Sequence, residues 1–225
     1  DTLERANANL RPGEKLLAYL DDVYIISSPD RARAVYDNVT QEISSHIGIQ
    51  VNFGKTECWS PAGGPAPVGI AELDAPAPLP PGWKGNLTSE HNGIEILGSP
   101  IGQVAYIDRV LNDKLDEETK LLDNLQHMSR AQVSWLLLFF CGAPRSNYIL
   151  RTVPPSLCAR YAESRDGLIR QCLGSILHID PEHLARTQCC SQLHMPAKYG
   201  GLGLQSSIHV SPCAYWASWC DAKPI

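Results

Sequence analysis

The chain has 225 residues, of which 44% are hydrophobic, and a formal net charge of −5 at pH 7. This length and apolar content suffice to bury a core in one or two domains. The acidic balance excludes a uniformly basic nucleic-acid-binding protein.

Two adjacent carboxylates, Asp21 and Asp22, interrupt the apolar run LLAYLDDVYIIS at residues 16–27. β-Branched and aromatic residues on both sides, with Tyr19 shortly before the acids, predict a tight hairpin with the two acids at its tip. A folded core rarely tolerates such acids unless a cation neutralises them, and oxygen ligands suit Mg²⁺ or Mn²⁺. The pattern therefore predicts half of a metal site for phosphoryl or nucleotidyl transfer. The alternative is a solvated turn, because aspartates are common turn residues.

A helix is predicted directly after this hairpin. Ser28 is a suitable N-cap and Pro29 suits the first helical position. Apolar residues then recur every four positions until Gly48 ends the helix: Val35, Val39, Ile43 and Ile47. A short strand is expected at residues 49–52, and Lys55 follows it; a lone surface lysine after a strand is the alternative interpretation of that residue.

Residues 60–92 contain seven prolines and five glycines and show no helical period. They are predicted to form a loop insertion or linker, with a polyproline ligand at residues 76–81 as the weaker alternative. Order returns at residues 93–101, where alternating residues turn at Gly98. This pattern predicts a second hairpin.

The chain is predicted to be helical from Tyr106 onward. One long helix carries an apolar stripe, and the acidic run Asp116-Glu117-Glu118 is expected on its exposed surface. The leucines of this stripe are Leu111, Leu115, Leu122 and Leu125. A capping box at residues 129–132 opens the next helix, which is too short to span a bilayer and is expected to end at residues 142–144. Further helices are predicted at residues 146–152, 156–177 and 181–194.

Charge is distributed unevenly along the sequence. Residues 1–105 hold seven Lys or Arg against thirteen Asp or Glu, whereas residues 124–162 contain four arginines and no acid. These four residues are the predicted phosphate-binding stretch: Arg130, Arg145, Arg151 and Arg160. The alternative is that they pair with the acidic helix that precedes them.

Eight cysteines are present without paired Cys-x-x-Cys spacing. We expect no signal peptide. We therefore expect free thiols and an intracellular location, nuclear or cytoplasmic, rather than secretion, and no membrane association. A zinc site remains open as an alternative, although adjacent cysteines are awkward ligands for one ion. Its candidate ligands are His178, His183, Cys189, Cys190 and His194.

The segment AYLDDVYIIS resembles the aromatic-x-Asp-Asp catalytic loop of reverse transcriptases, and later motifs resemble the same family in the same order. Residues 52–56, Asn-Phe-Gly-Lys-Thr, are similar to the family's next palm motif. Residues 93–101 resemble its Leu-Gly primer-grip hairpin. Pro196, followed by Gly-Gly-Leu-Gly at residues 200–203, resembles a segment found after the thumb in non-LTR retrotransposon proteins. The resemblance implies that a helix of small residues follows it at residues 214–218.

The resemblance implies an α+β fold. Residues 1–105 would form a partial palm, a small antiparallel sheet with a helix, interrupted by the insertion at residues 60–92. Residues 106–225 would form an all-helical thumb and connector.

The resemblance also implies roles for individual residues in an RNA-directed DNA polymerase. Asp21 and Asp22 would bind Mg²⁺ or Mn²⁺ and act in two-metal nucleotidyl transfer to a primer 3′-OH, with Tyr19 supporting their loop. Lys55 would stabilise the leaving pyrophosphate of the incoming dNTP, while Leu97 and Gly98 would hold the primer end. The implied partners are an RNA template, a DNA primer and dNTP.

The resemblance begins at the Asp-Asp hairpin, so we expect the family's fingers and first catalytic aspartate to be missing from this chain. With two of three carboxylates, the metal is expected to bind only in the complete enzyme, and the isolated chain is expected to be inactive. Two alternatives remain open: a non-catalytic retroelement remnant that folds or binds nucleic acid weakly, and an unrelated metal-dependent phosphotransferase.

Overall fold

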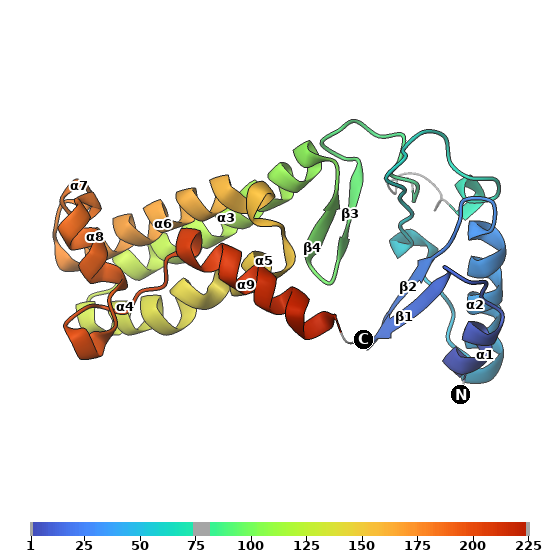
Figure 1. Cartoon of the computed structure of the whole chain (residues 1–225), viewed down its shortest axis with the longest axis horizontal. Helices are drawn as coiled ribbons and strands as arrows, with labels where there is room; N and C mark the ends of the chain where they lie inside the picture. Colours follow the sequence, from blue (N-terminus) through green and yellow to red (C-terminus); the bar gives the residue numbers. More distant parts are fainter. Residues whose placement is uncertain (1, 74–81, 224–225) are drawn as a thin grey trace. The chain divides into compact units, whose positions relative to one another are not determined.

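The computed structural model describes residues 2–73 and 82–223, and the chain divides into two compact units, Asp1–Ile94 and Glu95–Ile225 (Figure 1). In the described residues, two small antiparallel hairpins accompany a larger number of helices, so the chain is α+β as predicted. The segment considered as a polyproline ligand, residues 76–81, lies outside the described residues.

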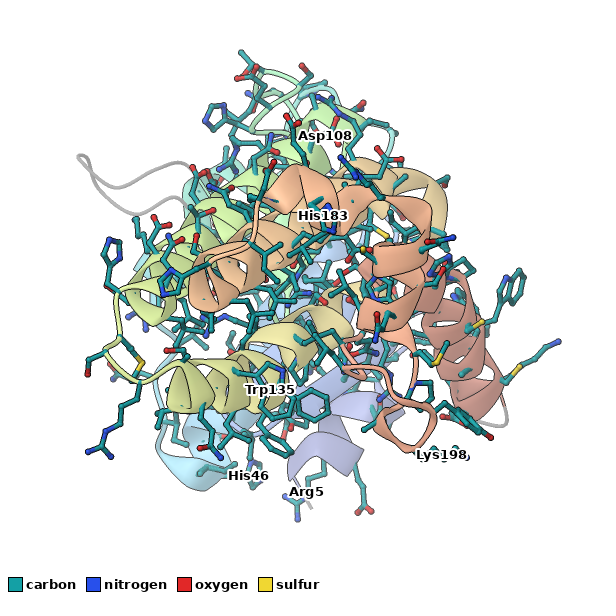
Figure 2. All side chains as sticks on the ribbon, turned by 90° about the vertical axis from the view of Figure 1, so that its left-hand side faces the viewer. Arg5, His46, Asp108, Trp135, His183 and Lys198 are labelled. Carbon is teal, nitrogen blue, oxygen red and sulfur yellow. The ribbon has the colours of Figure 1, made fainter. Side chains whose placement is uncertain are left out.

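The first unit packs one face of a hairpin against two helices. Its elements are α1 (Thr2–Ala8), β1 (Lys15–Tyr19), β2 (Asp22–Ile26) and α2 (Ala32–Ile47). Val35 and Val39 of α2 are buried, and the cross-strand pair Leu16 and Ile25 packs against them. Arg5 of α1 also donates a hydrogen bond to the His46 ring of α2; both residues are labelled in Figure 2.

Helix α2 begins three residues later than predicted. Its N-cap is Arg31, without a side-chain capping bond, and the Arg31 amide donates to the Ser28 carbonyl at 3.0 Å in a preceding turn. The Ser28 side chain hydrogen-bonds Asp30 instead of capping the helix, and this bond lowers the pKa of Asp30. The predicted end is confirmed, since Gly48 adopts a left-handed φ of 73° and its amide bonds the Ser44 carbonyl.

The strand predicted at residues 49–52 is wrong, because this described stretch is irregular and leads into a short 3₁₀ turn, Phe53–Lys55. Asn52 organises that turn. Its side-chain oxygen accepts from the Gly54 amide at 3.0 Å, and its carbonyl accepts from the Lys55 amide at 3.0 Å. Local side-chain bonding to the backbone thus replaces a strand ladder here.

The proline-rich insertion lacks regular strands or long helices in its described part, as expected of a loop, yet it has a small core of its own. Ile70, Leu73 and Trp83 are buried, and Tyr36 of α2 packs against them. The Trp83 indole N–H donates to the Gly64 carbonyl at 3.0 Å. The insertion is therefore packed on α2 rather than free of the fold.

The second hairpin consists of β3 (Gly93–Ile96) and β4 (Ser99–Gly102), and helices follow it. The long helices α3 and α6 run side by side, and α9 packs on α5 and α6 (Figure 1). The helices are α3 (Val104–Gln126), α4 (Ala131–Leu137), α5 (Asn147–Thr152), α6 (Pro155–Leu177), α7 (Pro181–Ala185), α8 (Thr187–His194) and α9 (Ser207–Ala222). A π-helical turn (Leu138–Gly142) and a 3₁₀ turn (Ala143–Ser146) connect α4 to α5.

Several helix predictions are confirmed and others need correction. The predicted leucine stripe of α3 is buried or partly buried, and α5 and α6 match their predicted ranges. The capping box is wrong, because Arg130 is the N-cap of α4 and makes no side-chain capping bond. The chain also stays helical beyond residues 142–144. Extended Arg186 splits the helix predicted at residues 181–194 into α7 and α8, and α9 is longer than predicted.

Glu118 is buried, with 6% of its surface exposed, so the expectation that it lies on the exposed surface of α3 is wrong. It follows Leu111 by seven residues and therefore shares the face of the leucine stripe. Arg165 of α6 pairs with it at 2.7 Å, and the Tyr161 hydroxyl donates to its other oxygen at 2.7 Å. Burial raises the pKa of Tyr161.

The Arg165 guanidinium, itself 1% exposed, makes further bonds to the backbone. It donates to the carbonyls of Gly142 and Ala143, at 2.6 and 3.1 Å, where the π-helical turn meets the 3₁₀ turn. It also donates to the Ser207 hydroxyl at 3.1 Å. One buried cation therefore joins α3, α6, this junction and the start of α9.

The neighbouring Asp166 is buried at the N-terminus of α9. Its carboxylate accepts from the Ser206 hydroxyl at 2.6 Å and from the Ser207 amide at 2.7 Å. A longer bond of 3.4 Å comes from the Ile208 amide. Asp166 thus binds amides at the start of a helix to which it does not belong, where a negative charge is favourable.

We predict that thiol labelling at pH 8 separates the cysteines by burial. Cys141, Cys213 and Cys220 are exposed, whereas Cys158 and Cys172 are buried. Burial raises the pKa of Cys172 to about 11, so its reactive thiolate is scarce at this pH. Mass spectrometry after a short iodoacetamide pulse should find the exposed thiols modified and Cys172 unmodified until denaturant is added. Labelling of native Cys172 as fast as Cys213 would contradict its burial.

Within residues 2–73 and 82–223, no helix combines the length and the apolar character needed to cross a membrane.

Candidate functional site

The predicted Asp-Asp hairpin is present, but only one aspartate lies in its turn. Strands β1 and β2 pair in antiparallel register from Lys15 with Ile26 to Tyr19 with Asp22. Leu20 and Asp21 form the two-residue turn, so Asp22 is the first residue of β2 rather than part of the tip. Leu20 has a φ of 55° and is 90% exposed.

The two faces of the hairpin differ in their surroundings. Leu16 and Ile25 face the core of the first unit. Since side chains alternate along a strand, the cross-strand pair Tyr19 and Asp22 lies on the opposite face together with Tyr24. The Tyr24 hydroxyl donates to Asp22 Oδ2 at 3.0 Å, and both Asp21 and Asp22 are exposed. The hairpin thus orients one carboxylate and presents both to solvent.

Carboxylates are suitable ligands for a hard divalent cation, but two of them are too few to fill its coordination shell. Carboxylate oxygens are the ligands that Mg²⁺ and Mn²⁺ prefer. Among the residues that the structure describes, no three His, Cys, Asp or Glu side chains come close enough together to hold a metal ion. Asp21 and Asp22 would hold such an ion only with water, phosphate oxygens or other protein groups completing its coordination shell.

Lys55 lies in the same unit, at the end of the turn organised by Asn52. Its side chain is exposed and makes no ion pair with a described residue. The role in binding nucleotide phosphates remains a prediction.

Leu97 and Gly98 form the turn between β3 and β4, which confirms the turn predicted at Gly98. Both have left-handed backbones, with φ values of 49° and 78°. Positive φ at both central residues is the geometry that two-residue hairpins favour, and glycine meets it without strain. Leu97 is 44% exposed, so its side chain is available for contact, and the primer-grip role remains a prediction.

The four predicted phosphate-binding arginines are all exposed, and each lies on a different element of the second unit. Arg130 precedes α4, and Arg145 lies in the 3₁₀ turn after the π-helical turn. Arg151 lies in the last turn of α5, and Arg160 lies on α6. In the described part of the chain none of them forms an ion pair, so the alternative pairing with the acidic helix is not observed.

The candidate zinc ligands do not form a cluster in the described structure. His178 caps the end of α6 and His183 lies in the short α7. Cys189 and Cys190 are half-buried in α8. His194 Nδ1 donates to the Leu204 carbonyl at 2.8 Å. In the described structure these side chains therefore do not form the alternative zinc site.

No protein-family model, curated protein or solved structure matched this chain.

Sequence reasoning missed the buried Glu118–Arg165 pair and Asp166. A signal for Glu118 was present, because it occupies the stripe position between Leu115 and Leu122. Arg165 follows Tyr161 by one helical turn and therefore lies on the same face of α6. Asp166 gave no such signal, since its partners lie some forty residues later.

We predict that replacing Leu20 with glycine stabilises the first unit by about 0.5–1 kcal/mol. A left-handed backbone costs an L-residue roughly 1–2 kcal/mol, and glycine removes this cost. Part of the benefit is offset because glycine has more conformational freedom in the unfolded chain. The exposed Leu20 side chain gives up little packing. Urea unfolding followed by first-unit amide signals measures the change. Leu20→Ala is the matched control, since it shortens the side chain but keeps the strain; equal stabilities of the two variants would contradict the prediction.

Proposed function

We propose that this chain is part of a retroelement RNA-directed DNA polymerase, with a palm segment in residues 1–105 and a thumb and connector in residues 106–225. The observation that carries the proposal is the Asp-Asp hairpin, in which Asp21 lies in the turn, Asp22 begins β2 and is bonded by Tyr24, and both carboxylates are exposed. The order of the motifs along the sequence supports it, as does the exposure of the four arginines.

In this proposal each candidate residue has a defined role. Asp21 and Asp22 hold Mg²⁺ or Mn²⁺, which would activate a primer 3′-OH and stabilise the leaving pyrophosphate when bound. Lys55 contacts phosphates of the incoming dNTP, and Leu97 with Gly98 contacts the primer end. Arg130, Arg145, Arg151 and Arg160 bind the phosphate backbone of the primer and template.

Binding of an RNA–DNA primer-template duplex tests the proposal. If all four arginines contact phosphates, log K should fall with log[salt] with a slope of about −3.6, from roughly −0.9 per phosphate contact. Arg151→Gln should weaken binding and reduce the magnitude of this slope by about 0.9. Fluorescence anisotropy with a labelled duplex measures both quantities. Arg186→Gln, outside the proposed set, is the matched control, and absence of duplex binding at low salt would refute the proposal.

A second candidate, a non-catalytic retroelement remnant, is favoured by the lack of a third metal-binding side chain near Asp21 and Asp22 in the described residues. For the isolated chain we expect no primer extension with Mg²⁺ or Mn²⁺ on a primed RNA template. Extension that is abolished by Asp21→Asn would instead assign catalysis to these residues and exclude the remnant.

A further inference from the structure

A cavity of about 610 Å³ lies in the second unit, among the π-helical turn, the segment before α9 and the first turns of α9. This volume falls within the range of small-molecule sites, roughly 300–1,000 Å³. Neither the hairpin nor the predicted primer grip contributes to it. The lining combines two phenylalanines, two histidines and the amide side chain of Gln205.

The aromatic wall is built by the π-helical turn. Phe139 and Phe140 are consecutive, with their ring centroids 4.9 Å apart in an edge-to-face arrangement. Phe139 is fixed from behind by Trp135, labelled in Figure 2, at 5.6 Å between ring centroids. Gly203 approaches it so closely that an added Cβ would lie 3.3 Å from the Phe139 ring. Phe140, by contrast, is 68% exposed and offers a ring on which a planar group can stack.

Hydrogen-bonding groups lie in the same cavity. Because the Leu204 carbonyl can only accept, His194 Nδ1 carries its proton, and Nε2 of the neutral ring is an acceptor. The His209 ring stands edge-to-face at 6.3 Å from the His194 ring. Gln205 adds an amide that can both donate and accept. These groups match the mixed donor and acceptor edge of a heterocycle better than a purely apolar ligand.

Arg165 and Asp166, with their buried hydrogen-bond partners, support one side of the cavity. The hydroxyl of Ser206, a lining residue, donates a hydrogen bond of 2.6 Å to Asp166 Oδ2. Arg165 donates to the carbonyls of Gly142 and Ala143. These contacts position the segment before α9 and the end of the π-helical turn, so the cavity is held in shape before a ligand binds. The exposed Arg145 follows the lining residues Ala143 and Pro144 directly in sequence.

We propose that this cavity binds one unstacked nucleobase of a single-stranded nucleic acid, with the base stacked on Phe140 and Arg145 near its phosphate. Base stacking on exposed aromatic side chains, combined with nearby cations, is the common mode of single-strand binding. Among the described residues, no acidic side chain lines the cavity. The inference rests on the proposed function, because it names where that protein would hold an unpaired strand.

The test compares two fluorescein-labelled 12-mers of equal charge, one oligothymidylate and one with abasic sites in place of the bases, by anisotropy at fixed salt. Wild-type protein should bind the base-containing strand about tenfold more tightly. Phe140→Ala should abolish this difference in affinity, whereas Arg145→Gln should weaken the binding of both strands to the same extent. Tyr199→Ala is the matched control, because Tyr199 is 67% exposed and lies outside the cavity lining. Circular dichroism confirms that each variant is folded.

The outcomes separate this inference from the proposed function. Equal binding of both strands by wild-type protein, or an unchanged preference in Phe140→Ala, overturns the base site even if duplex binding persists. Binding of neither the strands nor the duplex overturns both. A peptide with a central tryptophan serves as a competitor for the labelled strands. If it does not displace oligothymidylate, and if Phe140→Ala but not Tyr199→Ala removes the preference for the base-containing strand, the cavity is assigned to nucleobases. Displacement by the peptide would instead assign the cavity to an aromatic residue of a protein partner.

Discussion

Replacing Arg165 with methionine is expected to destabilise the second unit by about 3–5 kcal/mol. The substitution leaves the buried Glu118 carboxylate without its charged partner, and removing one member of a buried ion pair typically costs this much. The carbonyls of Gly142 and Ala143 lose their donor as well. Urea unfolding followed by second-unit amide signals measures the loss, which is large enough to unfold a marginal domain.

The matched control for this prediction is Arg160→Met, since Arg160 lies on the same helix with an exposed side chain. It should change the free energy of unfolding by less than about 0.5 kcal/mol. The double variant Glu118→Met with Arg165→Met should recover part of the loss, because a buried charge no longer lacks a partner. A cost below 1 kcal/mol for Arg165→Met alone would show that the pair is not buried as described.

Replacing Asp166 with alanine is expected to cost about 2–4 kcal/mol, because it removes two short hydrogen bonds to a buried carboxylate and leaves the Ser207 amide without an acceptor. The loss should be concentrated at α9. Amide hydrogen exchange over residues 207–210 measures it locally, and urea unfolding gives the total.

Glu163→Ala is the control for this prediction, because Glu163 is an exposed acid on the same helix. It should leave exchange in α9 unchanged. If Asp166→Ala retained native protection at Ser207 and Ile208, the carboxylate would not anchor the helix.

Much of the fold could be predicted because it depends on local pattern. The β-rich flanks of the Asp-Asp pair, the glycine that ends α2 and the leucine stripe of α3 each act within one element. Errors arose where a side chain had a competing partner. Ser28 bonds Asp30 instead of capping α2, and Asn52 closes a turn where a strand was expected.

The candidate site was predicted less completely, because register decides which residues share a face. The two-residue turn assigns Leu20 and Asp21 to the tip and moves Asp22 into β2, a difference of one residue that composition does not determine. The cavity lined by Phe139 and Phe140 depends on the π-helical turn, whose wider hydrogen-bond spacing has no clear sequence signature. The partners of Asp166 lie on another helix, so only the tertiary structure reveals them.

The contacts of Arg165 and Asp166 join residues separated by more than forty positions in sequence, to Glu118 on one side and to Ser207 on the other. Closing such long loops is slow and late in folding, because chain entropy opposes contacts between distant residues. We therefore expect helix α9 to form only after α3 and α6 have paired. We therefore expect the first amides of α9 to exchange only when the whole second unit opens, whereas those near Ala222 exchange by local fraying. The C-terminal helix would then report, at its two ends, on two different unfolding events.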